Sequence, residues 1–562
     1  MRVLRGVVLA ATAFSASGAC APRAATPPLT PLSRDAYAHY LRGRVAAYEG
    51  DHGLAVQELR AAAAAAPDEG RIDVALIDAL LRADRQMEAA EVADVAQRRW
   101  PRDPEVWLAS GAVYRKLGAT ERALAAYQQA IRLDRRDERG YVGLGTTWTQ
   151  LGEPGRAEDT WRDLLRAVPT SIEGHYRLAA RLLDRGLPRD AEPHLRAVLE
   201  RDPDHVDARL ALGRALRLQN RLPEAIAAHR QAFDRAGNPV DVGEELFWLL
   251  LEADDRRAAV DLLGLLDDPS ADSDDRVTLS RLYLTLGDLD RAQRQAETAL
   301  AAAPASGEAM VAMARVQRDR GELDGAVATA MAVPETSPAM ASARSLASEI
   351  LIERGDAAAA VAAVEAARAV HPRDPDLVLA HALALHARGR DADARHIVDA
   401  AVRAQPRSVG LLYAWATFED ETGHPDRAMA IVDRLLASDD DYIAALNFAG
   451  FTRADRGRDL DRAQRLLERA RRLAPGDPYV MDSWGWLLHR RGRQRDAARA
   501  LAHAARIAPR EPEILLHLGE VWAALGDPRK AQGVLESARA LAPPQRLRAR
   551  IDARLTALRG GR

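Results

Sequence analysis

Residues 104–137 contain two short runs in which apolar and small residues recur at helical spacing. The first run places three such residues on one face: Trp107, Gly111 and Tyr114. The second run does the same with Ala123, Tyr127 and Ala130. Gly118 lies between the runs, and polar residues fill the remaining positions. The pattern predicts two short amphipathic helices that approach each other closely at their small residues, with the rings filling the remaining space.

This pattern recurs every 34 residues along nearly the whole chain. Fifteen units span residues 36–545, and they begin at Ala36, Gly70, Pro104, Glu138, Ile172, Val206, Val240, Ser273, Gly307, Ala341, Pro375, Val409, Ile443, Pro478 and Pro512. An alanine opens the second run of every unit, from Ala55 to Ala531. In most units a glycine stands between the two runs and a proline stops the second one. Only residues 240–272 and 443–477 depart from this length, by one residue each.

This helix–turn–helix unit resembles the tetratricopeptide repeat (TPR), whose period is about 34 residues. The resemblance implies an all-α fold, a right-handed superhelix (α-solenoid) of about 15 repeats in which each repeat is stabilised mainly by its neighbours. Residues 546–562 are expected to form a cap helix and tail over the last apolar face. In the family, the first helices line a concave groove, and positions 2, 5, 9 and 12 of each repeat face it.

The first 35 residues differ from the repeats. Residues 1–20 carry two arginines, an apolar run and then small residues before Cys20, which is the layout of a secretory signal peptide. Their ending resembles the lipobox of bacterial lipoproteins, in which the cysteine is lipidated, although Ser17 stands where leucine is usual. Residues 21–35 are rich in proline and alanine, so we expect an extended tether. We predict export with a lipid anchor at Cys20; export without an anchor is the alternative.

Composition removes several classes of function. The formal net charge is −3, whereas a nucleic-acid-binding protein normally carries a strong basic excess. The single cysteine excludes an intramolecular disulfide and a zinc-ribbon site. No catalytic or phosphate-binding motif is present. His381 and His386 fall on different faces of one expected helix, with His371 in the preceding turn, so they predict no metal site. We therefore expect a protein that is not an enzyme and has no cofactor.

Aromatic and polar residues concentrate at the groove positions of the twelfth to fourteenth repeats. These positions hold Tyr413, Thr417, Asp420, Asn447, Phe451, Tyr479, Asp482, Trp486 and His489. Rings provide contact area, and an asparagine can hydrogen-bond a peptide backbone, so the pattern predicts a site for an extended segment of a partner protein. The predicted binding residues are Tyr413, Asn447, Phe451, Tyr479, Asp482, Trp486 and His489. The alternative is that several of these rings only pack between repeats.

Other parts of the groove are more mixed, and two segments have a charge bias. Midway along the chain the groove positions include Arg214, Arg217, Glu244 and Trp248. Acidic residues dominate residues 241–290 and are densest at residues 267–275, which we interpret as a solvated loop between repeats. Arginine dominates residues 453–510. The arginine-rich segment fits either a docking surface for an acidic partner or lipid headgroups, or simply a solvated face.

Residues 445–493 show a narrower resemblance. Asn447, Gly450, the lengthened turn DRGRDLDRA and the sequence DSWGW are similar to the C-terminal repeats of large TPR lipoproteins of Gram-negative outer membranes. Some of those proteins are adaptors that bind a periplasmic carboxyl-terminal processing protease and present substrates to it. The resemblance implies a scaffold or adaptor anchored in the outer membrane and facing the periplasm. The alternatives are a component of an outer-membrane assembly or polysaccharide-export machinery and, further behind, an enzyme with an unrecognised site.

Overall fold

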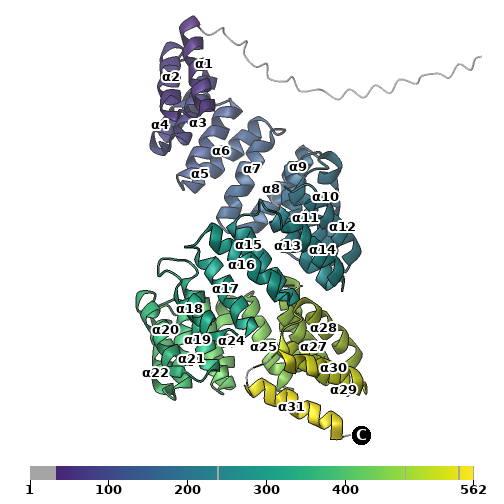
Figure 1. Ribbon diagram of the computed structural model, residues 1–562. Coiled ribbons are helices and arrows are strands. Elements are labelled where there is room, and N and C mark those ends of the chain that lie inside the picture. The colour runs from purple at the N-terminus through teal and green to yellow at the C-terminus, as the bar shows by residue number, and fades with distance from the viewer. Residues whose placement is uncertain (1–32, 237–238, 475, 542, 544, 561–562) are drawn as a thin grey trace, which may run out of the picture. The chain divides into compact units, whose positions relative to one another are not determined.

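The computed structural model describes residues 33–236, 239–474, 476–541, 543 and 545–560. In this part of the chain every regular element is an α-helix, and there are 31 of them (Figure 1). The expected signal peptide, Cys20 and all but the last three residues of the expected tether lie outside the described residues. None of the described helices is both long and apolar enough to cross a membrane.

The helices divide between two compact units, unit 1 (Met1–Ser171) and unit 2 (Ile172–Arg562). Unit 1 contains α1 (Arg34–Glu49), α2 (His52–Ala65), α3 (Gly70–Arg82), α4 (Gln86–Arg99), α5 (Pro104–Lys116), α6 (Thr120–Leu133), α7 (Glu138–Gln150) and α8 (Pro154–Ala167). Unit 2 contains α9 (Ile172–Asp184), α10 (Pro188–Arg201), α11 (Val206–Leu218), α12 (Leu222–Phe233), α13 (Pro239–Glu252), α14 (Arg256–Leu266), α15 (Ser273–Leu286), α16 (Leu289–Ala302), α17 (Gly307–Arg320), α18 (Leu323–Met331), α19 (Met340–Glu353), α20 (Ala357–Val370), α21 (Pro375–Ala387), α22 (Asp391–Ala404), α23 (Val409–Glu421), α24 (Pro425–Ser438), α25 (Ile443–Asp455), α26 (Leu460–Leu473), α27 (Pro478–Arg490), α28 (Gln494–Ile507), α29 (Pro512–Ala524), α30 (Pro528–Ala540) and α31 (Gln545–Gly560).

The predicted fold class is confirmed. Helices α1 to α30 form consecutive hairpins, and the first helix of each hairpin begins within two residues of the start expected from the repeat. The helix α31 follows the last hairpin, where a cap helix was expected. One boundary differs slightly: α1 begins at Arg34, because Ser33 caps it by accepting a hydrogen bond from the Ala36 N–H. The last two residues of the expected tether are therefore helical.

Local signals fix the ends of these helices, as α5 illustrates. The Asp103 carboxylate accepts a hydrogen bond from the Glu105 N–H at 3.0 Å, and Pro104 occupies the first turn, where its missing N–H is harmless. After the helix, Gly118 has a φ of +71°, a conformation that costs glycine little. Capping residues, prolines and glycines that can be recognised in the sequence thus lie where the helices of a hairpin begin and end.

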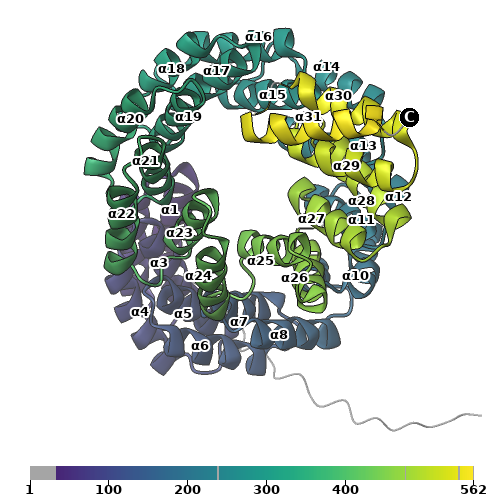
Figure 2. The ribbon, with the colours of Figure 1, turned by 90° about the horizontal axis from the view of Figure 1, so that it is seen from below.

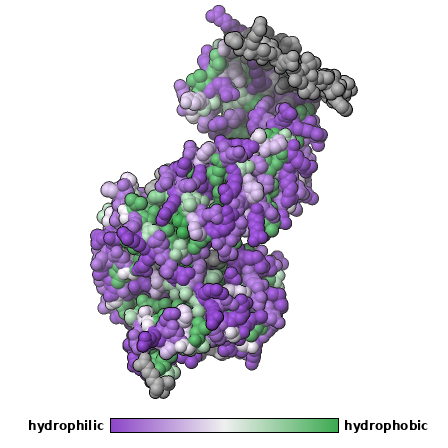
Figure 3. Space-filling view, turned by 90° about the vertical axis from the view of Figure 1, so that its right-hand side faces the viewer, coloured by the Kyte–Doolittle hydropathy of each residue, from purple (hydrophilic) through white to green (hydrophobic). Residues whose placement is uncertain are grey.

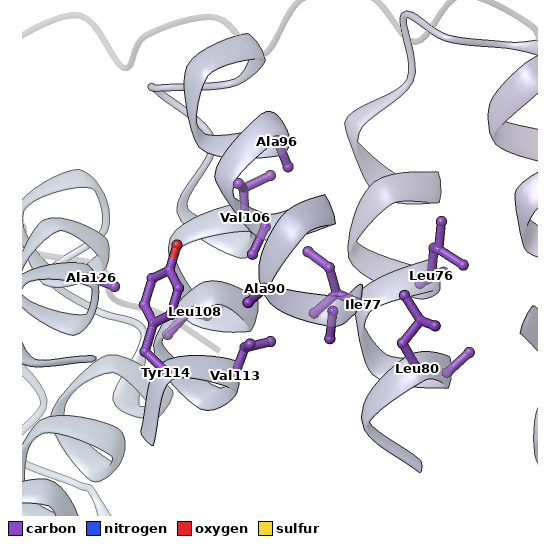
Figure 4. Close-up of a cluster of buried hydrophobic side chains, with 14 of the residues drawn as sticks. Leu76, Ile77, Leu80, Ala90, Ala96, Val106, Leu108, Val113, Tyr114 and Ala126 are labelled. Carbon is purple, nitrogen blue, oxygen red and sulfur yellow. The ribbon is translucent and has the colours of Figure 1, made fainter. Parts of the chain in front are cut away.

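Close packing within a hairpin explains the small residue in the middle of many first helices. A Cβ atom added at Gly111 would lie 2.7 Å from the Tyr127 ring, and one added at Gly485 would lie 2.6 Å from the Leu501 side chain. The alanine that opens each second helix is equally confined, and Ala292, for example, is fully buried. In unit 1, Figure 4 shows the resulting core, in which Ile77 comes from one hairpin and Val106 and Tyr114 come from the next.

Two parts of unit 2 that are distant in the sequence lie against each other. In Figure 2 the helices of this unit follow a ring, and α13 packs against α28. Across this junction, Arg510 Nη2 donates a hydrogen bond to Asp319 Oδ2 at 2.9 Å, and His503 Nε2 lies 4.0 Å from Glu252 Oε1. We call this junction, between residues 217–319 and residues 471–510, the seam. Unit 2 therefore has contacts between distant repeats in addition to those between neighbours.

Candidate binding site

Surface hydropathy alone does not single out a binding site. On the face shown in Figure 3, hydrophilic residues dominate and apolar residues form separate patches. The site must therefore be sought in the concave surfaces and in the positions of the residues predicted from the sequence.

The predicted residues Asp482 and Trp486 are buried inside the solenoid, at 7% and 5% exposure. His517 Nδ1 lies 3.0 and 2.9 Å from the two carboxylate oxygens of Asp482. The Trp486 ring stacks on His517, with ring centroids 4.5 Å apart, and its indole N–H donates to Asp455 Oδ1 at 3.1 Å. For these two residues the structure favours packing between repeats, the alternative to partner contact.

Two more predicted residues, Phe451 and His489, belong to the same packed cluster. The Phe451 ring lies 5.7 Å from the His517 ring, and the His489 ring stacks on Trp486 at 4.9 Å between centroids. Burial favours a neutral His517, but the Asp482 carboxylate outweighs burial and raises the pKa of His517. The cluster thus holds α25, α27 and α29 together through stacked rings around a buried ion pair.

Tyr413 and Asn447 are half-buried and keep some access to solvent. The Tyr413 ring meets the Tyr442 ring edge-on at 5.6 Å, and burial raises the pKa of the Tyr413 hydroxyl. The Asn447 Oδ1 atom is buried and accepts no hydrogen bond within the described part of the chain. The role of Asn447 toward a peptide N–H stays a prediction.

Tyr479 differs from the other predicted residues because it is 52% exposed and lines a large cavity. The cavity has a volume of about 1210 Å³ and lies along the seam of unit 2. Residues from both sides of the seam line it, among them Tyr176, Arg214, Trp248, Arg472, Tyr479 and Arg510. Its volume exceeds the roughly 300–1,000 Å³ typical of small-molecule pockets. It is therefore large enough for a segment of polypeptide.

Ion pairs neutralise most of the arginines around this cavity. Arg217 Nε donates to Glu252 Oε2 at 2.6 Å, and Arg469 Nε donates to Asp441 Oδ1 at 2.7 Å. Arg214 forms an ion pair with Glu245. Burial acts to raise the pKa of Glu245, but hydrogen bonds from His229 and Arg214 outweigh burial and lower this pKa to about 2. Arg472 is exposed and has no ion pair within the described residues. The lining thus offers an arginine available to a partner.

The acid beside Tyr479 has an unusual environment. Burial raises the pKa of Glu511, and burial together with the charge of Glu511 raises the pKa of the Tyr479 hydroxyl. The Tyr479 hydroxyl therefore stays protonated and remains a hydrogen-bond donor across the physiological pH range. Ring, hydroxyl and the nearby Arg472 together provide apolar, donor and cationic contacts.

A second groove continues from the cavity along the first helices of four repeats. It has a volume of about 760 Å³ and runs over α15, α17, α19 and α21. Its lining includes the apolar residues Val311, Leu346 and Leu379 beside charged ones, and Thr285 lines both the groove and the cavity. The two hollows therefore form one elongated surface within unit 2, which suits an extended segment.

The sequence predicts a binding residue on one side of the cavity but does not indicate which residues form the opposite side. Tyr479 was predicted, and Arg214, Arg217 and Trp248 were noted only as mixed groove positions. Tyr176 was missed, although it stands at position 5 of its repeat. The repeat register was the available signal for all of them, but it carries no information on which distant repeats face each other. Among the described residues no group of three or more potential metal ligands comes together.

Comparisons with known proteins agree on the repeat. A family model described as tetratricopeptide repeat matches residues 176–239, 277–341 and 346–409, and a second with the same description matches residues 20–166. A TPR repeat-containing protein of Pseudomonas aeruginosa is 40% identical over 65 residues. That match covers 12% of this chain and 11% of that protein.

Solved structures of repeat proteins are also similar to parts of the chain. A tetratricopeptide repeat protein from Parabacteroides merdae is 14% identical, with 51% of this chain and 100% of that chain covered and a TM-score of 0.32. MamA from Desulfovibrio magneticus is 23% identical, with coverages of 28% and 90% and a TM-score of 0.27. YrrB, described as a TPR protein with an unusual peptide-binding site, is 20% identical, with coverages of 39% and 97% and a TM-score of 0.25.

Proposed function

Since this chain is a tetratricopeptide-repeat protein, we propose that it is a non-enzymatic scaffold that binds an extended segment of a partner protein in the concave surface of unit 2. Tetratricopeptide repeats generally serve as protein-interaction scaffolds. The observation that carries the proposal is the cavity of about 1210 Å³, which exposes the Tyr479 ring and the Arg472 guanidinium on one wall.

The lining of the cavity and groove defines the chemistry of the bound segment. Arg472 attracts an acidic side chain, and the Tyr479 ring provides an apolar surface with a donor at its tip. The apolar lining residues Val311, Leu346 and Leu379 accept an apolar part of the same segment. We therefore expect an extended segment that combines acidic and apolar residues.

Two substitutions separate binding from packing. Tyr479→Ala removes an exposed ring, so the protein should stay folded while its affinity for the partner falls about thirtyfold. Trp486→Ala removes a buried ring and should instead reduce the free energy of unfolding by roughly 3–5 kcal/mol. Affinity is measured by biolayer interferometry with a partner purified from cell envelopes, and stability by urea denaturation.

The matched control is Tyr48→Ala, since Tyr48 is 93% exposed in unit 1 and lies outside the cavity. Its affinity and stability should equal those of the wild type. If Tyr479→Ala bound as tightly as Tyr48→Ala, the partner would not use this wall of the cavity.

Anchoring in the cell envelope is the second part of the proposal. Residues 1–20 have the layout of an export signal, and Cys20 at its end would carry the lipid. Two or more acyl chains give lasting membrane attachment, whereas one does not. Cys20→Ser should therefore move the protein from the membrane fraction to the soluble fraction. Equal recovery of both proteins in the membrane fraction would contradict a lipid anchor.

The partner class rests on the narrower resemblance of residues 445–493 to outer-membrane TPR lipoproteins. By that resemblance the partner is a periplasmic carboxyl-terminal processing protease together with its substrates; the alternative is an outer-membrane assembly or polysaccharide-export machinery. Mass spectrometry of proteins co-purified from envelopes distinguishes the two. A protease supports the adaptor role, whereas glycosyltransferases or export channels support the alternative.

A further inference from the structure

The seam of unit 2 contains a cluster of basic side chains next to the cavity. Around His503 of α28 lie Arg506 of the same helix, Arg217 of α11, Arg471 of α26 and Glu252 of α13, all within electrostatic range of the imidazole. We call these residues the seam cluster. Glu252 is the one acid that acts on His503 in this group. Both sides of the seam contribute to it, so the cluster exists only when the distant repeats are in contact.

The Glu252 carboxylate does not accept hydrogen bonds from all the nitrogen donors of the cluster. Its Oε2 atom accepts a hydrogen bond from Arg217 Nε at 2.6 Å, while its Oε1 atom is 4.0 Å from His503 Nε2, beyond hydrogen-bond distance. His503 Nε2 and Arg506 Nε are buried atoms that have no hydrogen-bond partner in the described part of the chain. Two nitrogens from one helix are thus left without an acceptor at the seam.

Arg471 adds a further uncompensated charge. Its guanidinium lies 4.7 Å from the centre of the Trp484 ring, and Glu468 acts on it only through its charge, outside ion-pair distance. Burial lowers the pKa of Arg471 and of His503, which shows that the cluster disfavours further positive charge. Buried polar groups without partners, and cations in particular, reduce stability unless a counter-charge satisfies them.

We propose that the seam cluster binds an oxyanion, a carboxylate or phosphate group, between Arg217, Arg471, His503 and Arg506. The anion accepts hydrogen bonds from the nitrogens that lack a partner and contacts α28 on one side and α11 on the other. It therefore strengthens the contact between distant repeats and stabilises the form of unit 2 in which the two sides of the seam touch, which we call the closed form. This site shares Arg217 with the cavity, but it does not require the proposed recognition of a partner.

The anion has two possible sources, and Arg217 connects them. Of the cluster, Arg217 also lines the cavity, so an acidic side chain of a bound segment would approach the cluster past Arg217. Free phosphate would reach the same nitrogens from solvent. The chemistry recognised is the same in both cases, and the experiment below has one arm for each source.

The test is hydrogen exchange of the full chain, followed at residues 503–508 and 213–218 on the two sides of the seam. Inorganic phosphate should slow exchange at both segments relative to sodium chloride of equal ionic strength, by about tenfold at ten times its dissociation constant. Arg506→Gln and Arg471→Gln should abolish the effect. The matched control is Arg495→Gln, since Arg495 is an exposed arginine on the same helix, and it should respond like the wild type.

A second arm replaces phosphate by a glutamate-rich peptide. If phosphate slows exchange and the peptide does not, the site binds a free anion from solvent. If the peptide slows exchange as well, the site also binds the carboxylates of an acidic segment. The proposal is overturned if neither probe slows exchange at the seam, or if Arg495→Gln loses the response as fully as Arg506→Gln. Circular dichroism of each variant separates loss of the site from loss of folding, and neither result depends on whether a partner binds the cavity.

Discussion

At the scale of single residues, the pair formed by Asp482 and His517 shows how a groove position can become part of the core. Both side chains are buried, and the two are joined at 2.9 Å across successive repeats. A buried pair of this kind stabilises the fold because each side chain provides the hydrogen-bond partner that the other would otherwise lack. The Trp486 ring stacks on His517, and the Phe451 ring lies tilted against it.

Asp482→Asn tests this role and its pH dependence. The raised pKa of His517 means that the pair stabilises the fold fully below the unfolded histidine pKa of about 6.5 and loses this contribution as pH rises through the folded pKa. The variant should lose about 1–3 kcal/mol of unfolding free energy at pH 6, and a smaller amount at high pH. Urea denaturation at a series of pH values measures both.

Asp159→Asn is the control, because the Asp159 side chain is 76% exposed. Its stability should follow that of the wild type at every pH. A loss in Asp482→Asn that grew with rising pH would contradict a charged His517 in the folded state.

At the scale of elements, the hairpins could be predicted almost completely from the sequence. Each one is specified by neighbouring residues, such as the Asp103 cap, Pro104 in the first turn and Gly118 in the turn. The site could be predicted only in part. Position 9 of the fourteenth repeat is groove-facing in the family pattern, yet Trp486 is buried there, because His517 of the next repeat supplies a stacking partner. A repeat register predicts on which face a residue lies but not what covers it.

Ala292→Leu tests the close approach inside a hairpin. Ala292 is fully buried in α16, so a larger side chain should overpack its repeat at a loss of about 1–3 kcal/mol. Hydrogen exchange should quicken in that hairpin and its neighbours, since the repeats are coupled to their neighbours. The control is Ala301→Leu, an exposed position of the same helix, where the change should stay within about 0.5 kcal/mol. Uniformly faster exchange along the whole chain would contradict coupling limited to neighbouring repeats and would indicate a more globular stack.

At the scale of the whole molecule, the seam is the feature that the sequence could not reveal. Arg510 and Asp319 are 191 residues apart, and no local pattern links them. Their contact depends on the accumulated rotation of every repeat between them, so a small change per repeat would separate them. The seam also creates the cavity, because the walls of the cavity come from repeats that are far apart in the sequence.

Reversing the charges of this pair tests whether it holds the seam closed. Arg510→Glu should weaken the closed form by up to about 1 kcal/mol, since both side chains are about one third exposed, and small-angle scattering at low salt should then report a larger radius of gyration. The double variant Arg510→Glu with Asp319→Arg should restore the wild-type value. Arg354→Glu, which breaks an ion pair between adjacent repeats with Asp324, should have no such effect. Failure of the double variant to recover would show that the pair does not act through its charges.

The central claim is that the cavity along the seam holds an extended segment of a partner protein, and site-specific crosslinking tests it most directly. A photoreactive phenylalanine analogue is placed at Tyr479 in the cavity and, separately, at Tyr48, which is 93% exposed in unit 1. After irradiation of intact cells, Tyr479 should give one dominant adduct, whose crosslinked peptide combines acidic and apolar residues and which disappears with Arg472→Glu. Tyr48 should not give that adduct. The same adduct from Tyr48 and none from Tyr479 would contradict the claim and place the binding surface outside the cavity.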